Sequence, residues 1–250
     1  MTNLTCLFGS QTLELNTHIN ILLPSDIKQG EKVKVLYLLH GYFGDHTDWI
    51  RLTSIERYIE KYRVAVVMPS ANNSYYTDMV YGLRYFTYMT EELPKFIERT
   101  FPISSKREDQ YIAGLSMGGY GALKIALSNP DRYHKAASLS GALDLEHIRK
   151  LSFGNGRQSQ YEATFGLTST LNTNNDLKYL ISNMTNKQKE ALDLFIGCGT
   201  EDFLYQDNIE FISYLKSQNL SYTYVESKGA HEWSFWDTYI QKVIQWMFQK

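Results

Sequence analysis

Short apolar runs that alternate with helical stretches are the feature of this chain that most limits its fold. Runs that are apolar throughout are typical of strands buried on both faces. Thr47 is the predicted N-cap of the first helix, and Pro94 is predicted to kink the second. Strands joined through helices imply right-handed crossovers, and hence a mainly parallel sheet with helices on both faces. Beyond the N-terminal region, strands are expected at 32–39, 64–68, 110–113, 135–139, 192–196 and 221–225, and helices at 47–62, 85–99, 117–128, 206–218 and 233–248.

The start and the middle of the chain depart from this alternation. Two strands, 5–8 and 18–23, come first with no helix between them, so they are expected to form an antiparallel edge of the sheet. From 143 to 189 the chain is rich in Asn, Thr, Ser, Gln and Gly. Because this stretch lies between two core strands, we interpret it as a cap-like excursion over the C-terminal edge of the sheet. The prediction is one α/β domain spanning residues 1–250.

The composition argues against several classes of protein. The chain has 25 Lys and Arg against 27 Asp and Glu, and a net charge of −2 gives no electrostatic basis for binding nucleic acid or an anionic membrane. Cys6 and Cys198 are too few for a disulfide framework or a metal site. The N-terminus lacks the pattern of a signal peptide, and no apolar run is long enough to cross a bilayer. The expected setting is the reducing cytoplasm.

A serine flanked by glycines lies where a predicted strand meets a predicted helix. The sequence GLSMG at 114–118 fits the Gly-x-Ser-x-Gly pattern, and its strand-turn-helix context is the one that a nucleophile elbow requires. In such a turn the serine takes strained backbone angles, and the positions two before and two after it have room only for glycine. The helix N-terminus favours negative charge beside it. Ser116 is therefore the candidate nucleophile.

A serine hydroxyl needs a base to take its proton. Ser116 lies at the C-terminal edge of a parallel sheet, so its partners must follow strands and not precede them. His231 follows the last strand through a short loop and is the predicted base. The other histidines are less suitably placed. His134 precedes a strand, His18 lies within a strand and His147 lies in the excursion. His46 lies at a helix start, and His40 lies beside a glycine expected to act through its backbone.

The base in turn needs an orienting carboxylate. Asp202 follows the strand before the one that leads to His231, so the two loops are expected to be neighbours. Asp144, which follows the strand 135–139, is the rival, and Glu201 ranks below Asp202. Asp193 begins a strand and is expected at the opposite edge. The order serine, acid, histidine is the one found in α/β-hydrolases.

Acyl transfer also needs donors for the oxyanion of the tetrahedral intermediate. One is expected to be the backbone N–H of Met117, which follows the nucleophile. The second is expected from the loop HGYFG at 40–44, after an early central strand, where Gly41 permits the bend. The Tyr42 backbone N–H is the prediction, with Phe43 as the alternative.

Several motifs in this order carry a resemblance to a known family: HGYFGDHTDW, YYTDMVYG, GLSMGGYGALK, CGTEDFLY and GAHEWSFWD. Over nearly its whole length the chain resembles the tributyrin-esterase branch of the esterase D-like hydrolases, relatives of the S-formylglutathione hydrolases. The resemblance implies an α/β-hydrolase fold with Ser116, Asp202 and His231 at the triad positions and Tyr42 at the oxyanion position. It also implies hydrolysis of short-chain acyl esters with no metal or organic cofactor.

The resemblance constrains the chemistry more than the substrate, because such relatives differ in the stretch 143–189. Expected substrates are small-molecule esters: tributyrin, p-nitrophenyl acetate and butyrate, and acetylated sugars. The alternatives are hydrolysis of S-formylglutathione, which the lack of a cysteine beside the oxyanion loop disfavours, and acyl transfer by the same triad. Relatives are often oligomeric, so a homo-oligomer is one of the expected states. Aromatic residues at 75–76, 153–165 and 233–236 are candidates for the wall of the acyl pocket.

Overall fold

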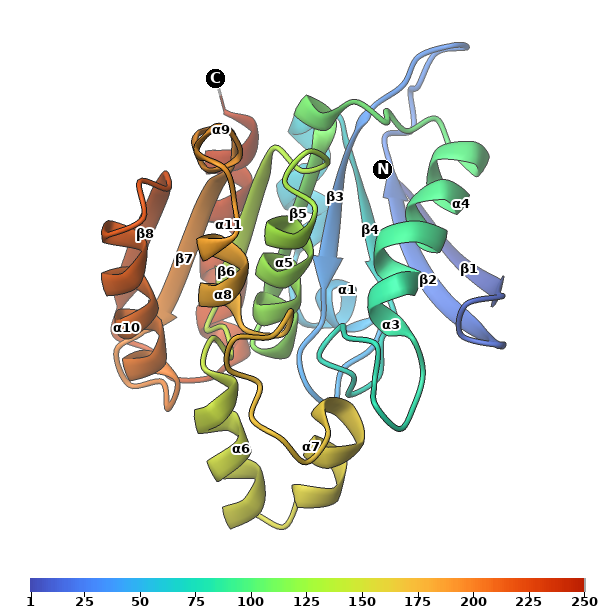
Figure 1. Ribbon diagram of the computed structural model, residues 1–250. Helices are drawn as coiled ribbons and strands as arrows, with labels where there is room; N and C mark the ends of the chain where they lie inside the picture. Colours follow the sequence, from blue (N-terminus) through green and yellow to red (C-terminus); the bar gives the residue numbers. More distant parts are fainter. Residues whose placement is uncertain (250) are drawn as a thin grey trace.

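A single sheet of eight strands organises the computed structural model, which describes residues 1–249 (Figure 1). Its order is β1-β2-β4-β3-β5-β6-β7-β8. In this order, β4, β3, β5, β6, β7 and β8 run parallel to one another, whereas β2 pairs antiparallel with β4 and with β1. The predicted parallel sheet with an antiparallel N-terminal edge is therefore confirmed. The strands are β1 (Thr2–Ser10), β2 (Leu15–Leu23), β3 (Lys34–Leu39), β4 (Val64–Pro69), β5 (Gln110–Leu115), β6 (Lys135–Leu139), β7 (Asp193–Gly199) and β8 (Tyr222–Ser227).

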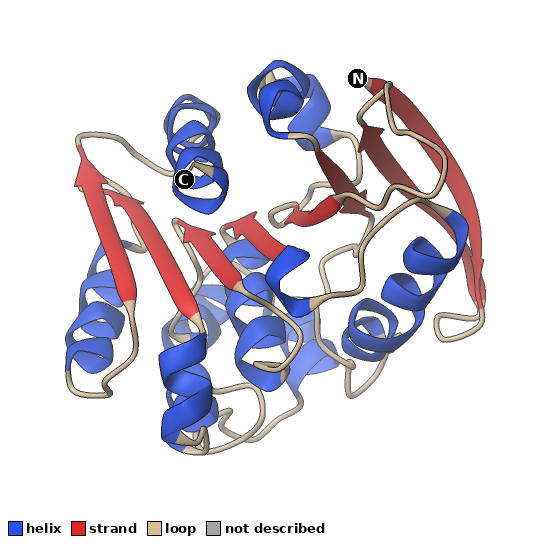
Figure 2. Cartoon of the chain, turned by 90° about the horizontal axis from the view of Figure 1, so that it is seen from above, coloured by secondary structure: helices blue, strands red, loops and turns tan. Residues whose placement is uncertain are grey.

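Helices cover both faces of this sheet (Figure 2). One face carries α1 (Asp48–Leu52), α2 (Ile55–Ile59) and α11 (Trp233–Phe248), and the other carries α3 (Tyr85–Thr87), α4 (Leu93–Thr100), α5 (Met117–Ser128) and α10 (Tyr205–Lys216). Each layer buries its own apolar core against the sheet, and for that reason β4 and β5 are buried along their whole length. No helix within residues 1–249 combines the length and the apolar character needed to span a bilayer.

The helix predicted over 47–62 is interrupted. The chain forms α1, then α2, then a 3-10 turn η1 (Glu60–Tyr62). The Thr53 hydroxyl donates to the Trp49 carbonyl and accepts from the Ile55 amide, so it replaces backbone bonds and ends α1. Thr47 is the N-cap residue of α1, as predicted, but its side chain makes no capping bond: the hydroxyl donates to Asp45 and accepts from Arg51 Nε. Because the Thr53 side chain competes for backbone partners, it breaks a helix that the spacing of apolar residues in the sequence would otherwise continue.

The helix predicted over 85–99 contains a change of helical type. A π-helical turn η2 (Tyr88–Glu92) separates α3 from α4, and Pro94 lies in the first turn of α4. Proline has no N–H to donate to the preceding turn, and a π turn is one way to absorb the lost hydrogen bond. The Glu92 carboxylate, at the end of that turn, accepts hydrogen bonds from the Gln11 and Thr12 amides and from the Ser10 hydroxyl. These bonds fasten the helix to the hairpin between β1 and β2.

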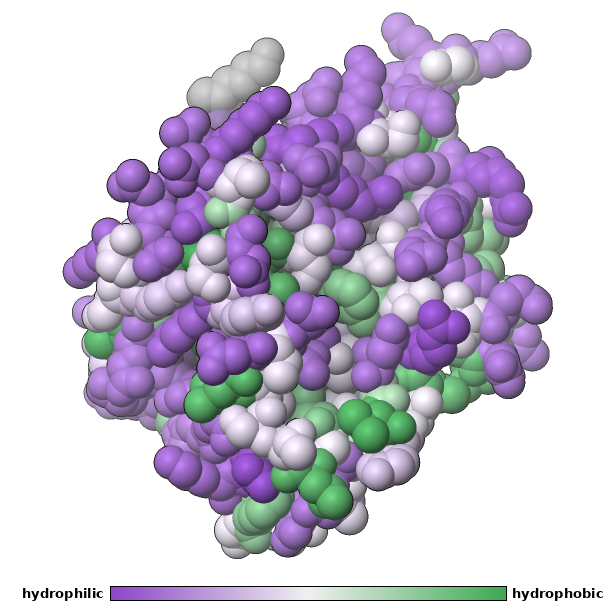
Figure 3. Space-filling view, viewed as in Figure 1, coloured by the Kyte–Doolittle hydropathy of each residue, from purple (hydrophilic) through white to green (hydrophobic). Residues whose placement is uncertain are grey.

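The stretch 143–189 has two structurally different halves. Its first half forms α6 (Leu145–Gly154) and α7 (Gln158–Phe165), which lie beyond the C-terminal ends of the central strands (Figure 1). Its second half returns through α8 (Leu177–Ser182) and α9 (Asn186–Ala191), and α8 packs beside α5 on the face of the sheet. Apolar surface is visible at the end of the molecule where α6 and α7 lie (Figure 3). Phe153 on α6 and Leu167 just after α7 are both exposed. A short 3-10 turn, η3 (Arg107–Asp109), precedes β5.

Candidate active site

Ser116 occupies the sharp turn between β5 and α5. Its backbone angles, φ 53° and ψ −118°, lie in a region that non-glycine residues rarely adopt, so the turn holds the serine under strain. A Cβ on Gly118 would lie 2.5 Å from the carbonyl oxygens of Leu39 and His40, and a Cβ on Gly114 would lie 2.3 Å from the Gly118 oxygen. Both glycines are therefore required by the close approach of β3, β5 and α5 at this point.

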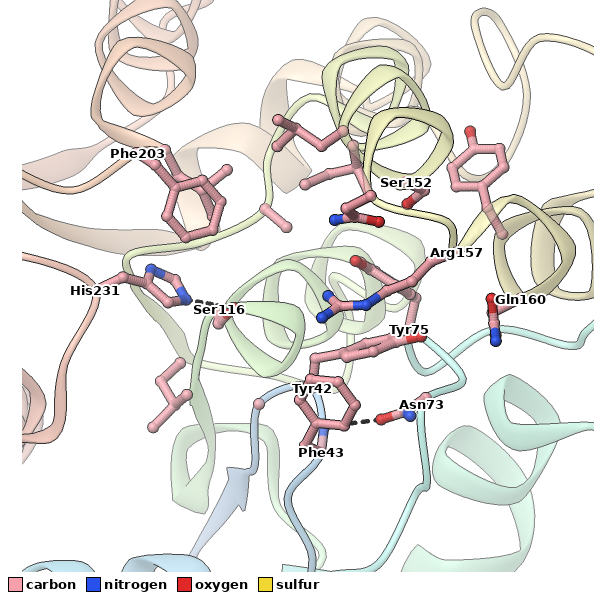
Figure 4. Close-up of a pocket in the computed structure, with 18 of the residues that line it drawn as sticks. Tyr42, Phe43, Asn73, Tyr75, Ser116, Ser152, Arg157, Gln160, Phe203 and His231 are labelled. Atoms are coloured by element: carbon pink, nitrogen blue, oxygen red, sulfur yellow. Dashed lines mark hydrogen bonds between the residues drawn. The ribbon is translucent and has the colours of Figure 1, made fainter.

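The three side chains proposed from the sequence as a triad meet at this turn (Figure 4). His231 Nε2 lies 2.9 Å from Ser116 Oγ. On the other side of the ring, Nδ1 lies 2.8 Å from Asp202 Oδ2 and 3.0 Å from Oδ1. Because the carboxylate can only accept, the Nδ1 proton points to Asp202, and Nε2 is left to accept the serine proton. The arrangement can deliver a proton from the hydroxyl to the imidazole.

The environment fixes both Asp202 and His231. The Asp202 side chain is fully buried, and its Oδ1 also accepts from the Leu204 amide at 2.9 Å. The imidazole is packed against two aromatic rings, with centroids 4.7 Å away at Phe203 and 4.9 Å away at Trp236. Phe203 was not anticipated as part of the site, although it directly follows the proposed acid in the sequence.

The rival acids serve other purposes. The Asp144 carboxylate is the N-cap of α6 and accepts from the amides of Glu146 and His147. Glu201 is exposed and lies 3.8 Å from Lys228 Nζ. His147 does contact a carboxylate, but this is Asp207, at 2.8 Å, and no hydrogen bond joins its ring to a serine within residues 1–249. Among the described residues, neither alternative carboxylate forms a hydrogen bond or an ion pair with His231.

The loop after β3 lies directly against the serine turn. A Cβ on Gly41 would be 2.5 Å from Leu115 Cδ1 and 3.5 Å from Ser116 Cβ, so only glycine permits this contact. The Phe43 amide donates to Asn73 Oδ1 at 2.8 Å and is thereby occupied. The amides of Tyr42 and Met117, in contrast, donate to no acceptor within residues 1–249. The geometry therefore favours the Tyr42 amide over that of Phe43 as the second oxyanion donor.

Asn73 and His40 hold this loop in shape. Asn73 was not anticipated, because an asparagine in a polar loop gives no sequence signal for a bond to a distant amide. His40 is buried, accepts from the Ala71 amide at Nε2 and lies 2.7 Å from the Gly41 carbonyl oxygen at Nδ1. Burial lowers the pKa of His40 to about 4, so the ring is neutral at pH 7. The His40 side chain therefore supports the backbone of this loop, a role that the sequence did not predict for it.

Because His40 is buried and neutral, we expect the free energy of unfolding to decrease in acid. Its pKa is about 4 in the folded chain against 6.5 for an ordinary histidine, so the unfolded chain binds the proton more tightly. The free energy of unfolding should therefore fall as the pH drops from about 6.5 to 4, by up to about 3 kcal/mol from this group. Urea unfolding of the wild type and of His40→Gln at pH 7 and at pH 5 measures it. The variant should be less stable at pH 7 and lose less on acidification; an equal loss in both proteins would rule out His40 as the source.

A cavity of about 310 Å³ opens above Ser116 and His231. Four of the aromatic residues proposed as its wall do line it: Tyr75, Tyr161, Trp233 and Trp236. Tyr76, Phe153, Phe165 and Phe235 do not. Tyr76 is fully buried with its hydroxyl donating to the His40 carbonyl, and Phe165 packs behind Tyr75 with ring centroids 5.3 Å apart. Residues that were not proposed for its wall also line it: Phe43, Asn73, Ile148, Leu151, Ser152, Arg157, Gln160 and Phe203.

The comparisons with known proteins agree with this geometry. Residues 10–246 match the family model described as "Putative esterase". The chain is 35% identical to an acetyl esterase of Caldicellulosiruptor saccharolyticus over 254 aligned positions, which cover 96% of each protein.

Solved structures of similar proteins extend the comparison to three dimensions. A substrate-bound fluorophosphonate-binding serine hydrolase of Staphylococcus aureus is 36% identical and superposes with a TM-score of 0.91, over 100% of this chain and 99% of that one. An S-formylglutathione hydrolase of the same organism, also 36% identical, has a TM-score of 0.89 over 99% of each chain. With a family model matched over nearly its whole length, this chain belongs to the esterase family of α/β-hydrolases and is a serine hydrolase that acts on carboxylic ester bonds.

Proposed function

We propose that this protein hydrolyses short-chain acyl esters, of the tributyrin or acetyl-ester kind, through an acyl-enzyme formed on Ser116. The observation that carries the proposal is the unbroken series of hydrogen bonds from Asp202 through His231 to Ser116 at the base of a cavity. The two amides of Tyr42 and Met117 beside that serine support the same chemistry. The limited cavity volume, about 310 Å³, favours small acyl groups.

In the first half of the reaction, Ser116 Oγ attacks the ester carbonyl while His231 Nε2 takes its proton. The carbonyl oxygen becomes an oxyanion and accepts hydrogen bonds from the Tyr42 and Met117 amides; losing one such donor typically costs about 3 kcal/mol. His231 then gives its proton to the leaving alcohol as the C–O bond breaks. Asp202 keeps the Nδ1–H tautomer in place and stabilises the imidazolium.

In the second half, water replaces the alcohol. His231 Nε2 takes a proton from the water, whose oxygen attacks the acyl carbonyl, and the oxyanion again forms beside the same two amides. The intermediate collapses, the acid leaves, and the proton returns to Ser116 Oγ. An alcohol in place of this water would give acyl transfer. Release of a new ester in the presence of added alcohols distinguishes that alternative.

Hydrolysis of S-formylglutathione is the second candidate function. The specific observation in its favour is the similarity to the Staphylococcus aureus protein of that name. A thioester passes through the same acyl-enzyme, so the triad does not separate the two candidates. The absence of a cysteine beside the loop 40–44 favours oxygen esters as substrates.

The cytoplasmic location and the homo-oligomeric state of this protein stay predictions from the sequence.

A panel of acyl substrates tests the proposed function. We expect kcat/KM to be highest for p-nitrophenyl acetate and butyrate and at least about tenfold lower for the octanoate, because the cavity of about 310 Å³ must hold part of the leaving group as well as the acyl chain. Tributyrin, acetylated sugars and S-formylglutathione belong in the same panel. Hydrolysis of the octanoate at the butyrate rate would contradict the short-chain assignment. A kcat/KM for S-formylglutathione well above that for every oxygen ester would favour the second candidate.

A further inference from the structure

One cationic side chain reaches into the active-site cavity. Arg157, in the turn between α6 and α7, directs its guanidinium toward Ser116 (Figure 4). Its Cζ lies 4.9 Å from the ring centroid of Phe43 and 5.7 Å from that of Tyr42. These cation–π contacts with two rings of the loop 40–44 restrict where the guanidinium can lie.

This guanidinium has no protein acceptor among residues 1–249. It takes part in none of their ion pairs and donates none of their side-chain hydrogen bonds, although an arginine carries five N–H donors. The carboxylate of Asp48, which also lines the cavity, is held by Arg51 at 2.8 Å. Neutral polar side chains also line the cavity, among them Asn73, Ser152, Asn155 and Gln160.

Arg149, on α6, has the protein partners that Arg157 lacks. It donates to the Leu167 carbonyl at 3.1 Å and lies 3.9 Å from Glu146, outside the cavity. Arg157 therefore presents an uncompensated positive charge and a planar set of donors to whatever occupies the cavity. A carboxylate is the group that matches such a fork in two hydrogen bonds.

The position of Arg157 relative to the base indicates which part of an ester it meets. His231 and Arg157 lie on opposite sides of Ser116 (Figure 4). The leaving-group oxygen must come within hydrogen-bond reach of His231 Nε2 to receive its proton. The leaving alcohol is thus on the His231 side, and the acyl group extends toward Arg157.

We propose that Arg157 is a specificity-determining residue that binds a carboxylate at the far end of the acyl group. The preferred substrates then include monoesters of short dicarboxylic acids. This inference rests on the proposed function, because it assumes that an acyl group is bound at Ser116. It names a substrate class that the triad and the oxyanion donors alone do not select.

The test compares two esters of similar shape, monoethyl succinate and ethyl butyrate, by enzymatic detection of released ethanol. The readout is the ratio of kcat/KM for the anionic ester to that for the neutral one. In Arg157→Gln this ratio should fall by about tenfold or more, the range expected for hydrogen bonds to a charged group. Using a ratio removes any general loss of activity caused by disturbing the oxyanion loop.

Arg149→Gln is the matched control, since it removes the same charge from the same part of the chain outside the cavity; its ratio should equal that of the wild type. An unchanged ratio in Arg157→Gln, or an equal fall in Arg149→Gln, would overturn the inference. Failure of the proposed function has a different signature. In that case Ser116→Ala would still hydrolyse ethyl butyrate. If Ser116→Ala loses this activity but the ratio is unchanged in Arg157→Gln, only the role of Arg157 is contradicted.

Discussion

Replacing Ser116 by alanine is expected to lower kcat for p-nitrophenyl butyrate by about a millionfold, the loss seen when a nucleophile is removed from a serine hydrolase triad. The hydroxyl has a single side-chain hydrogen-bond partner, His231 Nε2, so little packing is lost with it. Alanine retains the Cβ and tolerates the φ of 53° about as well as serine does. The folded structure should therefore persist, which circular dichroism and thermal unfolding can verify.

Ser138→Ala provides a control for this result. Ser138 is a fully buried serine on β6 whose hydroxyl has no hydrogen-bond partner within the described residues. Its replacement removes the same atom close to the site, and activity should stay within a few-fold of the wild type. Appreciable hydrolysis by Ser116→Ala, or a comparable loss in Ser138→Ala, would remove the nucleophile assignment.

Replacing Asp202 by asparagine should lower kcat by about 10⁴-fold with a smaller effect on KM, as in the serine protease precedent. The asparagine amide can donate to His231 Nδ1, which would place the ring proton on Nε2 and leave no base for the serine. Because the Asp202 side chain is fully buried, water cannot take its place. Steady-state kinetics with p-nitrophenyl butyrate measures the loss.

Two further aspartates make this test discriminating. Asp207 holds His147 with the same 2.8 Å contact, so Asp207→Asn alters a similar pair that is hydrogen-bonded to no serine within residues 1–249. Asp144→Asn alters the acid that ranked second in the sequence, and asparagine is an equally good N-cap for α6. Both variants should keep near-normal kcat. A large loss in Asp144→Asn with an active Asp202→Asn would mean that the wrong carboxylate had been chosen.

The sequence predicted the parts of the fold that depend on repeating patterns. Apolar runs such as 64–68 predict strands correctly because both faces of the sheet are covered, so each position must be apolar. The placement of residues after strands was equally informative, since parallel strands bring their C-terminal ends to one edge. That rule selected Asp202 and His231 from among several acids and histidines, and the structure brings both to Ser116.

Features that depend on single tertiary contacts could not be predicted in this way. The break at Thr53 arises because its hydroxyl bonds two backbone groups. The π turn before Pro94 ends at Glu92, whose carboxylate bonds the hairpin between β1 and β2. Asn73 and Arg157 approach the site from loops whose path the sequence does not encode as a periodic pattern. Each becomes visible only when the elements that carry it are placed in space.

Reaction with a fluorophosphonate, followed by mass spectrometry of the intact and digested protein, tests the central claim most directly. Such a reagent phosphonylates a serine only where a base activates it and an oxyanion site receives it. We expect one adduct per chain, on the peptide that contains Ser116, at a rate greatly reduced in His231→Ala, and no adduct in Ser116→Ala. An adduct on another residue, or unchanged labelling of Ser116→Ala, would contradict the account.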